Sequence, residues 1–317
     1  MKVLVTYALP IEGFSDYTSE FEFIFPENKQ AFTQEEVINL VGDADALLSM
    51  FNLPINKAII DAGKKLKIIS NFGVGFNNVD IEYAQSKGIR VTNTPDPVVE
   101  PTAELAFTLM GDLARRVSEC DKKLRRPNSI RWGVMENLGL GLYKKRLGII
   151  GMGRIGQSLA RRALASGMEI YYNNRKRLPK EKEEALRAQY LPLDELLKKA
   201  DYISLNAPLN ESTYHLIDKN ALNAMKTGSM VINTARGPII NEADLVIALQ
   251  EGKIGGAALD VFEFEPQIQH ELLSMDNVVL VPHIGTATLS ARNEMSRYAC
   301  ENIRRFFNGE EPLSIVV

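Results

Sequence analysis

The sequence predicts an α/β fold with two doubly wound parallel sheets. The chain has 317 residues, a length typical of two domains that each bury a core. Short apolar runs alternate with amphipathic segments along most of the chain, which is typical of parallel strands joined by helices. A glycine-rich loop follows one of these runs near the middle of the chain. These observations favour a two-domain enzyme.

Composition and charge exclude several other classes of protein. The chain has 45% hydrophobic and 24% charged residues, as soluble globular proteins do. Its 37 basic and 40 acidic residues form no broad basic surface, so we expect no nucleic-acid or membrane partner. Cys120 and Cys300 belong to no metal-binding or disulfide pattern, so we expect no metal and a reducing, cytoplasmic location. The N-terminal apolar run is too short for a signal peptide and is interpreted as a buried strand.

The first hundred residues predict the strands of one sheet. Residues 33–36 have the form of a capping box, and Gly88 ends a helical segment at residues 81–87. A proline-rich break at residues 94–97 leads into an amphipathic helix through Leu113, which we interpret as a connection between domains. The strands are expected at residues 3–5, 21–25, 46–50, 68–72 and 90–92.

A second α/β series follows an irregular arm at residues 125–141 that holds the only tryptophan, Trp132. Six strands with intervening helices make a complete Rossmann set. A final helix is expected at residues 289–308. The strands of this series are expected at residues 146–150, 169–173, 202–206, 229–233, 256–260 and 277–281.

The glycine-rich loop is residues 151–156, GMGRIG, and lies between a predicted strand and a predicted helix. G-x-G-x-x-G in that context predicts a dinucleotide-binding turn. Gly151 permits the tight turn, Gly153 lets the backbone approach a pyrophosphate, and Gly156 lets the helix pack against the strand. The helix N-terminus attracts the phosphates.

The end of the next strand favours NADP(H) over NAD. In NAD-binding proteins an acidic residue about 20 positions after the motif binds the adenosine ribose. Asn174 stands at that place, so no carboxylate repels a 2′-phosphate. Arg175, Lys176 and Arg177 follow and can attract one, although a solvated loop would also explain these cations, and NAD remains possible.

Three polar residues follow successive strands of the second series. Arg236, Glu265 and His283 should share one sheet edge, where ligands bind in open parallel sheets. Reduction of a carbonyl by hydride needs a cation on the substrate carboxylate, a proton donor for the developing alkoxide, and a group that keeps that donor protonated. These three residue types supply those roles. His215 and His270 are interpreted as structural.

Six segments resemble, in order, those of the D-isomer-specific 2-hydroxyacid dehydrogenase family, over nearly the whole chain. The resemblance is nearest to the glyoxylate and hydroxypyruvate reductase branch, which often uses NADPH. The segments are SNFGVGFNNVD at 70–80, VTNTP at 91–95, the loop at 151–156, NTARG at 233–237, ALDVFEFEP at 258–266 and PHIG at 282–285.

The resemblance implies roles for individual residues. His283 would be the proton donor, Glu265 its partner, and Arg236 the residue that binds and polarises the 2-oxo acid. The backbone N–H groups of Val74 and Gly75 would bind the substrate carboxylate, as successive amides in a turn can. The implied cofactor contacts are Thr102, Gly151, Gly153, Arg154, Ile155, Gly156, Asn174, Arg175, Ala207, Pro208, Thr213, Thr234, Ala235, Arg236 and Asp260.

The resemblance also implies two Rossmann-like domains with a cleft between them. Residues 1–98 and 289–317 would form a discontinuous, flavodoxin-like substrate-binding domain, and residues 99–288 the NAD(P)-binding domain. The segment around Trp132 resembles the dimerisation arm of relatives, so we expect a homodimer.

The leading hypothesis is NAD(P)H-dependent reduction of a small 2-oxo acid, such as glyoxylate or hydroxypyruvate, to the D-2-hydroxy acid. Relatives line the substrate pocket with the segment matching residues 48–54, where Phe51 and Leu53 could equally favour a bulkier acid such as phenylpyruvate. A short phosphoglycerate dehydrogenase is a further alternative. Formate dehydrogenase relatives lack the Glu265 type of carboxylate, which argues against that chemistry. A non-enzymatic nucleotide sensor gains no support, because the chain has no low-complexity tail.

Overall fold

The computed structural model describes residues 1–51 and 53–317. Residue contacts divide the chain into two compact units, one of residues 1–101 and 286–317 and the other of residues 102–285. Each unit is built on its own parallel sheet with helices on both faces, so the predicted α/β class is confirmed. Within the described residues, no helix has the length and apolar composition needed to cross a bilayer.

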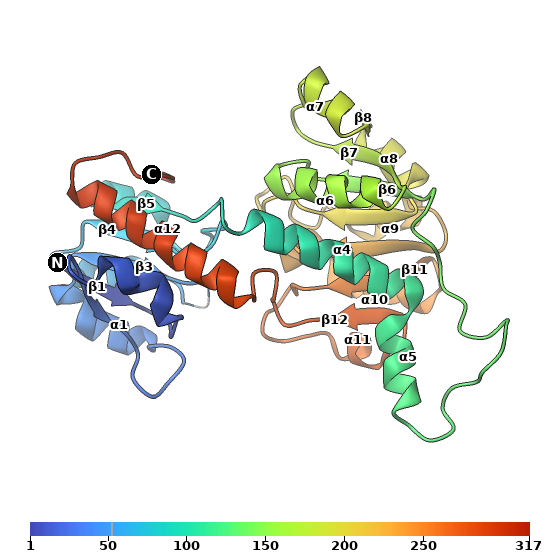
Figure 1. Ribbon diagram of the computed structural model, residues 1–317, viewed down its shortest axis with the longest axis horizontal. Helices are drawn as coiled ribbons and strands as arrows, with labels where there is room; N and C mark the ends of the chain where they lie inside the picture. The colour runs from blue at the N-terminus through green and yellow to red at the C-terminus, as the bar shows by residue number, and fades with distance from the viewer. Residues whose placement is uncertain (52) are drawn as a thin grey trace. The chain divides into compact units, whose positions relative to one another are not determined.

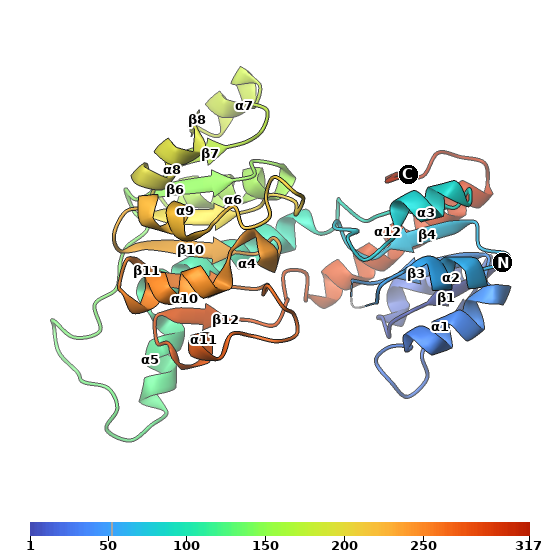
Figure 2. The same cartoon turned by 180° about the vertical axis from the view of Figure 1, so that it is seen from behind.

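The first unit has a sheet in the order β2-β1-β3-β4-β5 (Figure 1). Helix α12 (Leu289–Phe307) and the 3-10 helix η1 (Ile11–Tyr17) pack on one face. The other face is covered by α1 (Gln34–Leu40), α2 (Lys57–Ala62) and α3 (Ile81–Ser86), as Figure 2 shows. The strands are β1 (Lys2–Val5), β2 (Glu22–Ile24), β3 (Ala46–Ser49), β4 (Ile68–Asn71) and β5 (Arg90–Thr92).

Local sequence signals account for the helix ends in this unit. Thr33 caps α1, and Glu36 accepts a hydrogen bond from the Thr33 amide, so the predicted capping box is confirmed. Gly88 has a φ of 70°, a left-handed conformation in which glycine carries no steric penalty, directly after the α3 cap. A short 3-10 helix, η2 (Val41–Asp43), follows α1.

The second unit has a larger sheet in the order β12-β11-β10-β9-β6-β7-β8. Helices α4 (Val99–Arg115) and α6 (Arg154–Ala165) cover one face in Figure 1. Figure 2 shows α8 (Leu193–Lys199), α9 (Lys219–Ala224) and α10 (Glu242–Gln250) on the other. The strands are β6 (Arg146–Ile150), β7 (Glu169–Asn173), β8 (Ala188–Tyr190), β9 (Tyr202–Leu205), β10 (Ser229–Asn233), β11 (Ile254–Leu259) and β12 (Val278–Leu280).

The remaining helices of this unit have three to eight residues. They are α5 (Val117–Leu124), α7 (Lys180–Ala185), η3 (Gly237–Ile239) and α11 (His270–Ser274). The expectation of six strands here was wrong by one, because β8 was not anticipated. Its three residues, Ala-Gln-Tyr, carry no apolar run, and the strand pairs only with β7 at the sheet edge.

The strand order of the second unit reverses between β6 and β9, since β7 and β8 lie on one side of β6 and β9 to β12 on the other. Ligands of open parallel sheets bind beyond the carboxyl ends of the strands at such a switch point. The glycine-rich loop begins at Gly151, directly after β6, and therefore lies at this position.

Candidate functional site

The three glycines of the loop between β6 and α6 lie in different surroundings. Gly151 has a φ of 95°, and a Cβ there would lie 2.5 Å from the Ala207 nitrogen. A Cβ on Gly156 would lie 2.4 Å from the Gly151 oxygen. A Cβ on Gly153 would meet nothing within 4 Å, and Gly153 directly precedes α6, whose first turn holds Arg154 and Ile155. The protein's own backbone therefore explains the first and third glycines, whereas the second leaves room for an approaching phosphate.

Asn174 is bound to this loop. Its Oδ1 accepts a hydrogen bond of 2.6 Å from the Met152 amide. The amide of Gly151 donates to the Asn173 oxygen at 3.0 Å, so the end of β7 and the phosphate loop are linked twice. A neutral side chain thus occupies the place where an acidic residue would bind the ribose of NAD.

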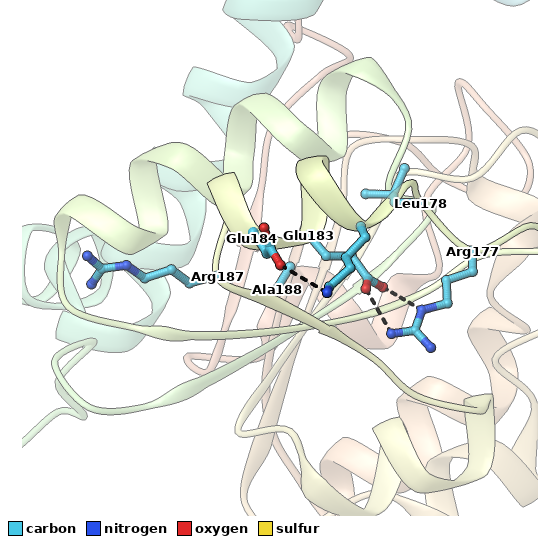
Figure 3. A pocket seen from close by; sticks show the side chains of 7 residues that line it. Arg177, Leu178, Glu183, Glu184, Arg187 and Ala188 are labelled. Carbon is cyan, nitrogen blue, oxygen red and sulfur yellow. Dashed lines mark hydrogen bonds and ion pairs between the residues drawn. The ribbon is translucent and has the colours of Figure 1, made fainter.

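The three cations after Asn174 do not share one environment. Arg175 and Lys176 are exposed, and among the described residues neither forms an ion pair. Arg177 donates from Nε and Nη2 to the two carboxylate oxygens of Glu183, each at 2.8 Å (Figure 3). The sequence had suggested that all three cations are available to a phosphate, and this pairing was not anticipated.

Other residues of the expected cofactor site gather at the same sheet edge. The loop after β9 is closed by Thr213, whose Oγ1 donates to the Pro208 oxygen at 2.7 Å. A Cβ on Gly285 would lie 3.1 Å from Asp260 Oδ2 and 3.5 Å from Thr102 Oγ1, so these side chains are neighbours. Within the described chain, the buried Thr234 Oγ1 and Asn206 Oδ1 have no hydrogen-bond partner. Unpartnered buried polar atoms beside an open glycine turn fit a bound dinucleotide.

His283 and Glu265 form a hydrogen-bonded pair at this edge. His283 Nδ1 lies 3.0 Å from Glu265 Oε2, and the side chains are 28% and 31% exposed. The second carboxylate oxygen of Glu265 accepts from the Phe262 amide at 2.9 Å. Burial raises the pKa of Glu265, but the hydrogen bond and charge of His283, the Phe262 amide and Arg236 outweigh it, so the net shift is downward. Glu265 is therefore a carboxylate at neutral pH.

Asp260 holds the loop that carries His283. Its Oδ1 accepts from the Ile284 amide at 2.5 Å and its Oδ2 from the Gly285 amide at 2.9 Å. The His283 amide donates to the Asp260 backbone oxygen at 2.9 Å and stabilises a φ of 53° at His283. Burial raises the pKa of Asp260 to about 6, although the two amides and the charge of His283 oppose the shift.

Arg236 lies on the turn after β10. Asn233 fixes this turn, since its Nδ2 donates to the Arg236 oxygen at 3.0 Å and its Oδ1 accepts from the Ala235 amide at 3.0 Å. A Cβ on Gly237 would lie 1.8 Å from the Phe262 oxygen, so the loops of Arg236 and Glu265 pack directly against each other. Burial lowers the pKa of the Arg236 guanidinium, an effect that Glu265 opposes. An arginine retains its charge under such a shift.

A second histidine pair was not expected from the sequence. His215 Nε2 lies 2.6 Å from Glu263 Oε1, and Glu263 Oε2 accepts from the Glu242 amide at 3.0 Å. Glu242 Oε1 accepts in turn from the Glu263 amide at 2.5 Å, and burial raises the pKa of Glu242. His215 was interpreted as structural, but no local signal identified Glu263 or Glu242 as its partners.

Val74 and Gly75 lie in the first unit, on the loop after β4. The Val74 oxygen accepts from Asn93 Nδ2 at 2.8 Å, and the Gly75 oxygen from Asn71 Nδ2 at 2.7 Å. Both asparagines are buried, so the two carbonyls are fixed. The amides of Val74 and Gly75 have no acceptor among the residues described, as an anion-binding turn requires.

The segment that follows β3 shows Phe51 44% exposed and Leu53 buried in the core. Asn52, between them, lies outside the described residues. Leu53 packs with the cluster that contains Val37, Ile55 and Ile59, on the α1 and α2 side of the sheet.

A switch-point glycine loop, a histidine–carboxylate pair and an arginine on one sheet edge define a nicotinamide-dependent oxidoreductase that acts on CH–OH groups. Residues 107–285 match the model of the D-isomer specific 2-hydroxyacid dehydrogenase family, NAD binding domain. The chain belongs to the D-isomer-specific 2-hydroxyacid dehydrogenase family.

Individual relatives match this chain over nearly their whole length. A glyoxylate reductase of Thermococcus onnurineus is 43% identical over 319 residues, covering 99% of this chain and 95% of the relative. The NADPH-dependent glyoxylate/hydroxypyruvate reductase of Sinorhizobium meliloti, in complex with NADP and malonate, has a TM-score of 0.86 at 32% identity, with 100% and 96% coverage. Holo D-mandelate dehydrogenase of Rhodotorula graminis has a TM-score of 0.90 at 30% identity, with 99% and 97% coverage.

Proposed function

We propose that this enzyme reduces a small 2-oxo acid, glyoxylate or hydroxypyruvate, to the D-2-hydroxy acid, with His283 as the proton donor. The observation that carries the proposal is the 3.0 Å pair of His283 and Glu265, together with the packing of the Glu265 loop against the turn of Arg236. The glyoxylate reductase among the relatives supports the choice of substrate.

Each residue has a role that follows from its chemistry. When bound, a nicotinamide cofactor would supply the hydride for the carbonyl carbon. His283 donates a proton to the carbonyl oxygen as negative charge develops there, and the carboxylate of Glu265 favours the protonated imidazole before transfer. Arg236 binds the substrate carboxylate through its fork of N–H groups and polarises the carbonyl.

The first unit supplies the other half of substrate recognition in this proposal. The amides of Val74 and Gly75, whose carbonyls are tied back by buried asparagines, donate to the substrate carboxylate. Residues 1–98 and 289–317 then act as the substrate-binding domain, and residues 99–288 as the cofactor-binding domain.

The preferred cofactor is NADPH. Asn174 carries no charge to repel a 2′-phosphate, and Arg175 and Lys176 are exposed beside it. The Sinorhizobium relative is described as NADPH-dependent, which supports the same preference. Bulkier acids remain the second candidate, because the D-mandelate dehydrogenase shares the fold and Phe51 is partly exposed after β3.

The arm at residues 125–141 supports a homodimer. Trp132, Val134 and Met135 on this arm are 86%, 93% and 77% exposed. Large apolar side chains grouped in this way are typical of surfaces that become buried on association. Sedimentation of the protein and of W132A should give a dimer and a weakened dimer, whereas a monomeric native protein would contradict the proposal.

Steady-state oxidation of NADPH and NADH tests the proposed reaction. Glyoxylate, hydroxypyruvate, pyruvate and phenylpyruvate are compared as substrates, with H283A as the control. We expect turnover of glyoxylate or hydroxypyruvate with NADPH preferred, and its loss in H283A. Faster turnover of phenylpyruvate would favour the bulkier-acid alternative, and tight cofactor binding with no turnover of any acid would contradict the proposal.

A further inference from the structure

The loop between β7 and α7 is fixed at both of its ends. At its start, Asn174 accepts from the Met152 amide of the phosphate loop. At its end, the Leu178 amide donates to the hydroxyl of Tyr172 at 2.8 Å, and Tyr172 is fully buried. Arg175, Lys176 and Arg177 therefore lie on a short segment with limited freedom.

Glu183 of α7 is the centre of the contacts at the second end. Its Oε1 accepts from the Tyr172 hydroxyl at 2.6 Å, and both oxygens accept from Arg177. The Glu183 side chain is 9% exposed, whereas that of Arg177 is 65% exposed. The bonds from Arg177 and Tyr172 lower the pKa of Glu183 to about 2, so the carboxylate is charged at every working pH.

Charge decides what this pair can offer to a ligand. A guanidinium that donates two hydrogen bonds to a carboxylate forms a pair with no net charge. A phosphate outside this pair is therefore attracted only weakly. Arg177 also lies 5.9 Å from the ring centroid of Tyr190, which packs on Tyr172 at 5.5 Å. Removing Arg177 from this position would leave the nearly buried carboxylate of Glu183 with Tyr172 as its remaining side-chain donor among the described residues.

We propose that Glu183 withholds Arg177 from the cofactor and thereby limits the selectivity for NADP over NAD, so that Arg175 and Lys176 alone attract the 2′-phosphate. The inference rests on the proposed preference for NADPH. It assigns Glu183 as a residue that tunes specificity from outside the cofactor site, and it makes Arg177 a structural rather than a binding cation.

The neighbouring residue offers a matched control. Glu184 lies on the same helix, next to Glu183, and lines the same shallow hollow of about 540 Å³ together with Arg187 (Figure 3). Its contact is with Lys180, at 3.6 Å, and its side chain is 68% exposed. E183Q and E184Q therefore remove the same charge from adjacent positions, but only E183Q weakens the hold on Arg177. The amide oxygen introduced by E183Q can still accept the Tyr172 hydroxyl bond, so the variant is expected to fold.

Binding is measured by calorimetry with two probes, adenosine 2′,5′-bisphosphate and 5′-AMP, which differ only in the 2′-phosphate. The ratio of their dissociation constants gives the selectivity for the 2′-phosphate and does not depend on turnover. We expect E183Q to raise the preference for the bisphosphate by about 3- to 10-fold and E184Q to change it less than about twofold. R177A should leave the ratio of dissociation constants within about twofold of the native value. The E183Q/R177A double variant should lack the increased preference for the bisphosphate that is expected in E183Q.

Two results would overturn the inference. The first is a fall in the preference for the bisphosphate in R177A that is as large as the fall in R175A, because Arg177 would then contact the phosphate in spite of Glu183. The second is an unchanged ratio in E183Q. The proposed cofactor preference is tested separately by the native protein and R175A: a native protein that binds both probes equally, and is unaffected by R175A, contradicts the NADPH preference whatever E183Q does.

Discussion

The described residues contain two histidine–glutamate pairs on the second unit, and both glutamates come from one loop. Glu265 lies 3.0 Å from His283, and Glu263, two positions earlier, lies 2.6 Å from His215. Glu265 is 31% exposed, whereas Glu263 is 8% exposed. The tighter and more buried pair is not the one proposed to transfer a proton.

The difference lies in what else each carboxylate binds. Glu263 exchanges two hydrogen bonds with the backbone and carboxylate of Glu242, at the start of α10. Glu265 is bonded to the amide of Phe262 within its own loop and to His283. A carboxylate tied into a helix terminus stabilises the fold, whereas the pair of Glu265, whose side chain is 31% exposed, can meet a substrate. Distance alone therefore does not distinguish the pair that is proposed to be catalytic.

Removal of His283 should have the largest effect on activity. H283A is expected to lower kcat/KM by about 10²- to 10⁴-fold, because no other group in the pair can supply the proton. Cofactor binding, followed by fluorescence titration with NADPH, should be retained. H215A is the matched variant, and an equal loss of kcat/KM in H215A would remove the distinction between the pairs.

Substitution of Glu265 should have the next largest effect. In E265Q the imidazolium loses its charged partner, so kcat is expected to fall by about 10- to 100-fold. Steady-state oxidation of NADPH measures this loss, and a kcat equal to that of the native enzyme would contradict the proposed role of Glu265.

Substitution of Glu263 should affect stability rather than turnover. E263A leaves the Glu242 amide and His215 without their acceptor, which is expected to lower the free energy of unfolding by about 1 to 3 kcal/mol. Urea denaturation measures this loss, and kcat at a temperature well below Tm should stay within about fivefold. A large loss of kcat in a stably folded E263A would assign the second pair to catalysis.

Asp260 is expected to affect the pH dependence of stability. Burial raises its pKa from 3.8 to about 6, so the folded state binds the proton more tightly than the unfolded state. Its contribution to stability is therefore greatest below about pH 4 and is lost as pH rises to about 6, by at most about 3 kcal/mol.

D260N carries no titrating group at this position. The change in unfolding free energy between about pH 4.5 and about pH 7, measured by urea denaturation, should therefore be smaller in D260N than in the native protein. The same change in both proteins would mean that burial does not shift Asp260 as described.

Much of the second sheet could be predicted because its strands are continuous apolar runs between turn residues. The predicted bounds of β6, β7 and β10 agree with the structure at both ends. Strand β8 was missed because three residues at a sheet edge bury too little to leave a pattern. The expected strand at residues 202–206 ends one position earlier, at Leu205, and Asn206 is left with a buried Oδ1 that has no partner among the described residues.

The candidate site could be predicted in part. Arg236, Glu265 and His283 follow successive strands of one parallel sheet, and parallel strands bring their carboxyl ends to one edge. The supporting residues could not be found in this way. Asn71 and Asn93 fix the carbonyls of Gly75 and Val74 from the ends of two different strands, and nothing in either local segment states which oxygen they contact.

The sequence by itself determined the α/β class, the glycine-rich loop and the three side chains that are proposed to react. These depend on local patterns: runs of apolar residues, turn glycines and residues that end strands. Only the tertiary structure decided which histidine pairs with which glutamate and which cation remains available beside Asn174. Glu263 is 48 positions from His215 and Glu265 is 18 from His283, so the choice depends on how the loops pack across neighbouring strands. Arg177 reaches Glu183 because Glu183 of α7 lies beside Tyr172 of β7, an arrangement that the charges alone do not state.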